Sequence, residues 1–103
     1  MRFRVSRPAQ KDLNEIFVYW AEQVSEAVAD GVVDAIIDRF RLLGEFPATG
    51  KPVDEIAAGV KCFPAGKYLI YYRKTRQVTD ILHIFHGARD QRLAFSSGRQ
   101  RRP

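Results

Sequence analysis

The chain has 103 residues, a formal net charge of +5 and 46% hydrophobic residues, which fits a single globular domain. Its one cysteine, Cys62, excludes an internal disulfide and does not indicate a metal site, and we expect no cofactor. The first residues lack the apolar run of a signal peptide, and no run approaches the roughly 18 apolar residues of a membrane span. We therefore expect a cytoplasmic protein without membrane contact.

The positive charge is concentrated in the second half of the chain. Residues 1–55 hold 7 Lys and Arg against 10 Asp and Glu, whereas residues 56–103 hold 10 against 2. This imbalance indicates an anionic partner, either nucleic acid or an acidic protein surface, although it also fits a basic tail that only aids solubility. The sequence predicts one domain over residues 1–95 and a basic flexible tail over residues 96–103.

The first half of the chain predicts a strand followed by a helical hairpin. The opening MRFRVSR alternates apolar and basic residues, as in a strand with one buried face. Ser6 is a candidate N-cap for a first helix, whose apolar residues recur at helical spacing as far as Val24. Ser25 is a candidate N-cap for a second helix that ends near Leu43.

Two features of the second helix call for an interpretation. Four acidic residues are spaced by four and form one stripe, which is typical of a solvated helix face: Glu26, Asp30, Asp34 and Asp38. Gly31 in the helix interior costs about 1 kcal/mol relative to alanine, and close approach of the two helices is the simplest reason to tolerate it.

Three strand-like runs occupy the second half, over residues 60–63, 67–73 and 78–86. The turns between them are short, so neighbouring strands are antiparallel. The predicted fold is α+β: an N-terminal strand, a helical hairpin and a three-stranded antiparallel meander. Strict alternation places Ile81, His83 and Phe85 on one face of the last strand, so both sheet faces are largely apolar. Two helices cover only one face; we expect a partner, or else the C-terminal segment, to cover the other.

The segment ILHIFHGARD, residues 81–90, places two histidines close to Arg89 and Asp90 and resembles catalytic equipment. Each residue also has a structural interpretation. His83 fits a packed strand histidine, Gly87 fits a backbone position with positive φ, and Arg89 and Asp90 fit a local ion pair. The residue pattern alone leaves both interpretations open.

The order of elements, together with four phrases, resembles the ParE branch of the RelE/ParE superfamily of bacterial toxins. The phrases are AQKDLNEIFVYWAE, LLGEFPATGKPV, FPAGKYLIYYR and ILHIFHGARD, and the resemblance covers Phe3 to Asp90. It implies the toxin of a type II toxin–antitoxin system, held inactive by a ParD-like antitoxin in a hetero-oligomer. It also implies DNA gyrase as the target and growth inhibition by a protein that is not an enzyme.

Two alternatives to a gyrase-poisoning toxin remain at this point. RelE-like members cut messenger RNA on the ribosome, and the residues available here for that chemistry are His86, Arg89, Arg73 and Lys61. The comparable C-terminal position is Phe95, which has no ionisable group and counts against cleavage. A degenerate toxin that only binds its antitoxin is the other alternative.

The candidate contact residues follow from the basic and apolar character of the predicted sheet and helices. For the target, the candidates are Lys67, Arg73, His86, Arg89 and Arg92. For the antitoxin, which is expected to dock an apolar segment over the helical hairpin and the sheet, they are Trp20, Phe40, Tyr68, Ile70 and Tyr72.

Overall fold

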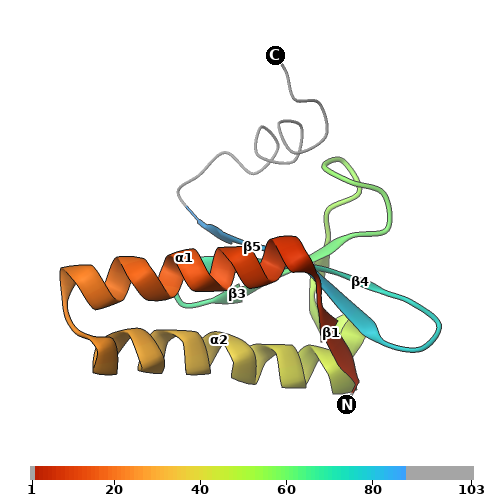
Figure 1. Ribbon diagram of the computed structural model, residues 1–103. Coiled ribbons are helices and arrows are strands. Elements are labelled where there is room, and N and C mark those ends of the chain that lie inside the picture. Colours follow the sequence, from red (N-terminus) through yellow and green to blue (C-terminus); the bar gives the residue numbers. More distant parts are fainter. Residues whose placement is uncertain (1, 88–103) are drawn as a thin grey trace.

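The computed structural model describes residues 2–87, in which two helices lie side by side on one face of a five-stranded sheet (Figure 1). The elements in chain order are β1 (Phe3–Val5), α1 (Arg7–Gln23), α2 (Glu26–Glu45), η1 (Pro47–Thr49), β2 (Lys51–Pro52), β3 (Lys61–Ala65), β4 (Tyr68–Lys74) and β5 (Thr79–His86). The predicted α+β fold is confirmed. Arg89, Asp90, Arg92 and the tail expected over residues 96–103 lie outside the described residues.

Both predicted helix caps are present. The Ser6 hydroxyl accepts a hydrogen bond from the Ala9 amide at 3.2 Å, and the Ser25 hydroxyl accepts one from the Val28 amide at 3.1 Å. Each hydroxyl satisfies one of the amide groups that the first helical turn leaves without a partner. The two caps fix where the chain turns, so the helices start where the sequence predicts.

The strand order in the sheet is β1-β5-β4-β3-β2. The β3–β4–β5 meander is antiparallel, as predicted, and β1 joins its edge parallel to β5. A further strand, the two-residue β2, pairs with β3 and was not predicted, because two residues give no period to detect. The parallel pairing brings β1 beside an element more than seventy residues later in the chain.

A β-bulge between β4 and β5 changes which side chains share a face. Tyr71 pairs with His83 and Tyr72 pairs with Ile81, so Leu82 is the extra residue. As a result Ile81 and Ile84 both face the helices, whereas strict alternation places them on opposite faces. The prediction that Ile81 shares a face with Phe85 is therefore wrong.

The main core lies between the helices and the sheet. Side chains from α1, α2, β4 and β5 fill it, and its fully buried members include Phe40, Ile70, Tyr72 and Ile81. The ring of Phe3 in β1 contacts Phe40 edge-on at 5.7 Å, which ties the edge strand to α2.

The second face of the sheet is covered in part by the chain's own connection between β2 and β3. Val53 and Val60 of this connection are buried against Tyr71 and Phe85, with Ile56, Ala57, Cys62, Leu69 and Leu82 packed around them. The sequence prediction assigned this cover to a partner or to the C-terminal segment. Residues 53–60, which the sequence predicts to be an irregular connection, carry apolar side chains that cover part of this face.

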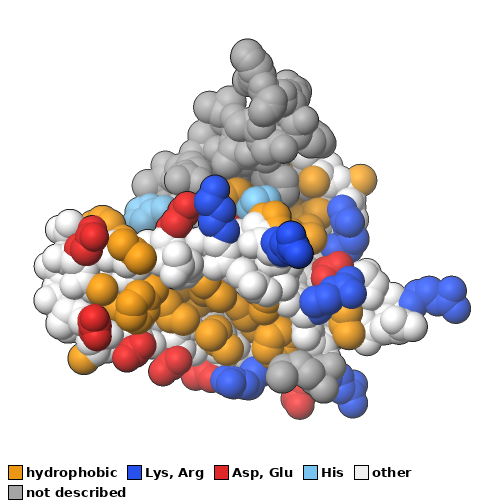
Figure 2. Space-filling model, viewed as in Figure 1, with side chains coloured by type: hydrophobic (Ala, Val, Ile, Leu, Met, Phe, Trp, Pro, Cys, Tyr) orange, Lys and Arg blue, Asp and Glu red, His pale blue; other side chains and the backbone are white. Residues whose placement is uncertain are grey.

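The surface of α2 confirms one expectation and corrects another. All four residues of the acidic stripe are exposed, and Figure 2 shows acidic side chains in a row along this helix. Gly31 is also exposed, and a Cβ built on it meets no atom within 4 Å. Close approach of the helices therefore does not explain this glycine.

Candidate partner-binding groove

A hydrogen bond between α1 and β4 forms the centre of the candidate site. The Trp20 indole Nε1 donates to the Tyr68 hydroxyl at 2.9 Å. The two side chains separate two hollows in the surface, and both residues line each of them. We call the two hollows together the Trp20–Tyr68 groove.

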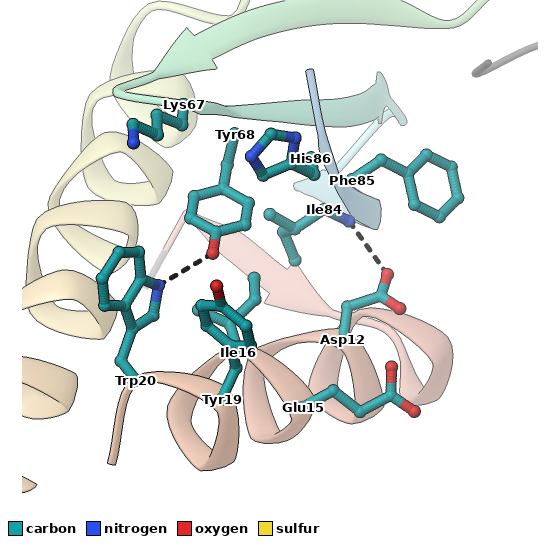
Figure 3. Close-up of a pocket in the computed structure, with 10 residues that line it drawn as sticks. All are labelled: Asp12, Glu15, Ile16, Tyr19, Trp20, Lys67, Tyr68, Ile84, Phe85 and His86. Atoms are coloured by element: carbon teal, nitrogen blue, oxygen red, sulfur yellow. Dashed lines mark hydrogen bonds between the residues drawn. The ribbon is translucent and has the colours of Figure 1, made fainter. Parts of the chain in front are cut away.

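The first hollow, of about 340 Å³, lies between α1 and the ends of β4 and β5 (Figure 3). Its lining is Asp12, Glu15, Ile16, Tyr19, Trp20, Lys67, Tyr68, Ile84, Phe85 and His86. Trp20 and Tyr19 rise from α1 toward Tyr68, while His86 packs edge-on against the Tyr68 ring at 5.6 Å. Aromatic rings with polar ends, next to both charge signs, suit a peptide that carries apolar and charged side chains.

The second hollow, of about 210 Å³, lies between α2 and the turn that joins β3 to β4. Its wall is mostly apolar, from Trp20, Val32, Ala35, Ile36, Ala65 and Tyr68, and the charged residues there are Arg39 and Lys67. An apolar hollow next to exposed cations fits an amphipathic segment with acidic residues. The two hollows thus adjoin at Trp20 and Tyr68, the first lined by apolar and charged residues and the second mostly by apolar ones.

Asp12 anchors α1 to the edge of β5 that extends beyond β1. Its Oδ2 accepts a hydrogen bond from the Ile84 amide at 2.9 Å and lies 3.1 Å from His83 Nδ1. Nearer the start of β5, Ser6 donates from its hydroxyl to the Leu82 carbonyl at 3.1 Å. These two polar side chains continue the edge pairing beyond the point where β1 ends, and so position α1 over the first hollow.

The structure divides the five predicted antitoxin contacts into two groups. Trp20 and Tyr68 frame the groove. Phe40, Ile70 and Tyr72 are each 0% exposed in the main core, so their side chains are not available to a partner. The sequence shows that these residues are apolar and lie in a helix or a strand. An apolar residue at the interface between helices and sheet is usually part of the core.

The predicted target contacts do not form one cluster. Lys67 and His86 both line the first hollow. Arg73 lies opposite Asp80 in the strand register, near the other end of β4. At the usual rise per residue of a strand, the backbone of Arg73 is about 17 Å from that of Tyr68. Lys61, of the alternative ribonuclease set, pairs with Tyr72 at that same far end. The described members of the ribonuclease set are therefore not brought together around one reacting atom.

Gly87 is not in a left-handed conformation, in contrast to the sequence expectation. The described glycines with positive φ are Gly59 and Gly66. At Gly87 a Cβ would lie 3.2 Å from the Lys67 carbonyl oxygen, which accepts a hydrogen bond from the Gly87 amide at 2.8 Å. Close backbone approach at the end of β5 thus accounts for this glycine.

Sequence reasoning missed several residues of the groove. In the sequence, Asp12 and Glu15 look like ordinary acidic residues on the solvated face of a helix. Val32 and Ala35 look like members of the apolar stripe of α2. The available signal was Tyr19, an aromatic residue directly before Trp20 and off the buried stripe, which is 53% exposed.

The described residues contain neither a candidate metal site nor an activated thiol. Within residues 2–87 no group of three His, Cys, Asp or Glu side chains could hold a metal ion. Cys62 lies under the β2–β3 connection, where burial raises the pKa of its thiol and so disfavours the thiolate. In the same part of the chain, neither helix is long and apolar enough to cross a membrane.

A small antiparallel meander covered by a helical hairpin, with two hollows at the helix–sheet junction, defines a compact α+β domain. Comparison with known proteins gives the family. The model of the ParE toxin of the type II toxin–antitoxin system parDE matches residues 3–91. The chain belongs to this family of toxins.

Two relatives agree with the family assignment. Toxin ParE1 of Caulobacter vibrioides is 24% identical over 90 residues, a stretch that spans 87% of this chain and 93% of the relative. A solved structure, described as a chromosomal ParDE toxin–antitoxin system from P. aeruginosa, matches with a TM-score of 0.74 and 19% identity over 84% of this chain and 95% of its own. The structural match confirms the fold.

Proposed function

We propose that this chain is a cytoplasmic toxin that poisons DNA gyrase, and that a ParD-like antitoxin neutralises it by seating an amphipathic segment in the Trp20–Tyr68 groove. The observation that supports the antitoxin site is the groove itself: two adjoining hollows with an apolar wall on a ParE-family fold. An apolar surface of this kind is a common binding site for a helical peptide segment.

The choice of gyrase rests on the family and on the arrangement of cations. Metal-free cleavage of RNA requires a base, a phosphate-holding cation and an acid around one phosphate. Lys61 and Arg73 lie at one end of β4 and His86 at the other, which weighs against a ribonuclease. We therefore propose a binding mechanism without catalysis, in which the toxin stabilises gyrase in its DNA-cleaved state.

The test of the target is a gyrase reaction with the purified chain, supercoiled plasmid and ATP, scored for linear DNA linked to protein. We expect cleaved complexes to accumulate with toxin concentration and to disappear when cognate antitoxin is added first. Folded toxin that leaves gyrase unaffected but cuts messenger RNA on ribosomes would replace this proposal with the ribonuclease. Normal growth of cells that express the chain without antitoxin would favour the degenerate toxin.

The test of the groove is a matched pair of variants on α2. Ala35 is exposed and lines the second hollow, whereas Ala27 is exposed and lines neither. We expect Ala35→Glu to weaken antitoxin binding at least tenfold, because it places a carboxylate on the apolar wall. Ala27→Glu should bind as the wild type does. Equal affinity of both variants would remove the groove from the antitoxin interface.

A further inference from the structure

Basic side chains gather at the end of the sheet away from the groove. Arg4 of β1, Arg73 and Lys74 of β4, and Arg76 of the turn between β4 and β5 are all exposed. We call these four residues the hairpin basic surface. Figure 1 shows the β4–β5 hairpin projecting from the side of the molecule that carries β1, and Figure 2 shows Lys and Arg side chains on that side.

Three strands hold the centre of this surface in register. Arg4 pairs with Asp80 across β1 and β5, and Asp80 pairs with Arg73 across β5 and β4. The Arg4 guanidinium donates to both Asp80 carboxylate oxygens, at 2.8 and 2.9 Å. The Asp80 carboxylate thus binds Arg4, whereas Arg73 lies beside it through the strand register, and one negative charge faces two positive charges.

The end of β4 and the turn after it add the cations of Lys74 and Arg76 to this surface. Within residues 2–87 no carboxylate forms an ion pair with Lys74 or Arg76. Arg4, Arg76 and Gln77 line a shallow hollow together with Thr75, whose hydroxyl already donates to the Val78 carbonyl at 2.8 Å. Guanidinium groups beside an amide donor are typical of phosphate contacts.

We propose that the hairpin basic surface binds the phosphate backbone of duplex DNA. The proposal goes beyond the gyrase function, because a duplex can bind here whether or not gyrase is the target. An acidic protein fits less well: protein interfaces centre on buried apolar anchors, and the large exposed apolar side chains of residues 2–87 all lie in α1, in α2 or close to their ends.

A duplex fits better than a single strand for a related reason. Proteins that bind single strands stack bases on exposed aromatic rings. The exposed aromatic residues among those described are Tyr19 in α1 and Phe46 after α2, and none belongs to the hairpin. A two-stranded ribbon tipped with cations instead matches the width of the major groove and the phosphates that border it.

The test measures binding of the full-length chain to a fluorescent 20-base-pair duplex over a series of salt concentrations, without gyrase. Each lost phosphate contact makes the slope of log affinity against log salt less negative by about 0.9. We expect Lys74→Gln/Arg76→Gln to change the slope by about 2. Lys11→Gln/Arg41→Gln, which removes one exposed Lys and one exposed Arg from α1 and α2, should change it by less than 1.

Three results would overturn the proposal: equal slopes for the two double variants, tighter binding to a single-stranded RNA of equal length, or tighter binding to poly-glutamate of equal charge. All variants keep residues 88–103, so these residues contribute equally to every measurement. Duplex binding without gyrase poisoning would leave this inference standing and remove the proposed target. Gyrase poisoning by the chain, together with equal salt slopes for the wild type and Lys74→Gln/Arg76→Gln, would keep the proposed target and overturn this inference.

Discussion

The hydroxyl of Tyr72 holds the backbone of Gly50 and Pro47 in place from the opposite side of the core. It accepts a hydrogen bond from the Gly50 amide at 2.8 Å and donates one to the Pro47 carbonyl at 2.7 Å. A Cβ on Gly50 would lie 2.3 Å from the same hydroxyl oxygen. The backbone conformation of the segment after α2 therefore depends on the Tyr72 hydroxyl and on the absence of a side chain at Gly50.

Tyr72→Phe should lower the free energy of unfolding by about 1–3 kcal/mol, because it leaves two backbone groups without partners. Urea denaturation measures this loss. Tyr68→Phe is the control: it removes the acceptor of the hydrogen bond that Trp20 donates, beside a hollow that water can enter. We expect the smaller effect there, and a larger loss for Tyr68→Phe would contradict this account.

Two glycines of α2 should respond in opposite ways to alanine. Gly31→Ala should stabilise the protein by about 1 kcal/mol, because the site is open and alanine is the better helix former. At Gly44 the new Cβ would lie 3.0 Å from Arg2 Cβ and 3.2 Å from its carbonyl carbon. Since the Arg2 carbonyl is held by the Thr79 amide, Gly44→Ala should lower the melting temperature. Stabilisation by both substitutions would show that β1 yields easily.

The elements that could be predicted from the sequence are those that local patterns determine. Ser6 and Ser25 cap the helices as expected, because a cap needs only its own first turn. The parallel pairing of β1 with β5 depends on contacts between residues more than seventy positions apart, which no local period encodes. The bulge at Leu82 likewise arises from strand pairing, and it moved Ile81 to the helix side of the sheet.

The groove was predicted less well than the fold. Trp20 and Tyr68 were predicted to contact the antitoxin because they are large aromatic residues; both line the groove, and that contact stays a prediction. Phe40 and Tyr72 were identified for the same reason but belong to the core, because apolar character alone does not separate a buried face from a binding face. Which face is buried follows from how α1 and α2 lie on the sheet.

Asp12→Ala should expose the edge of β5 to solvent. The Ile84 amide loses its acceptor, so we expect faster hydrogen exchange at that amide and a loss of about 1–3 kcal/mol in unfolding free energy. Asp12→Asn keeps an acceptor oxygen and should retain protection of the Ile84 amide. Glu15→Ala, an exposed neighbour on the same helix, should leave exchange unchanged. Unchanged hydrogen exchange at the Ile84 amide in Asp12→Ala would mean that the Asp12 carboxylate does not protect this amide.

The ion pair between Arg4 and Asp80 makes the free energy of unfolding depend on pH in the acidic range. The hydrogen bonds from Arg4, followed by its charge and that of Arg73, hold the Asp80 pKa below its ordinary value. A carboxyl whose folded pKa is lowered stabilises the folded state above its unfolded pKa, near 4, and this contribution is lost as pH falls through the folded value. Arg4→Gln should therefore raise the Asp80 pKa, as followed by NMR titration, and flatten the loss of stability below about pH 4. Arg73→Gln should raise it less, because Arg73 acts by charge alone and without a hydrogen bond. A larger shift in Arg73→Gln would place the principal partner of Asp80 on β4 instead of β1.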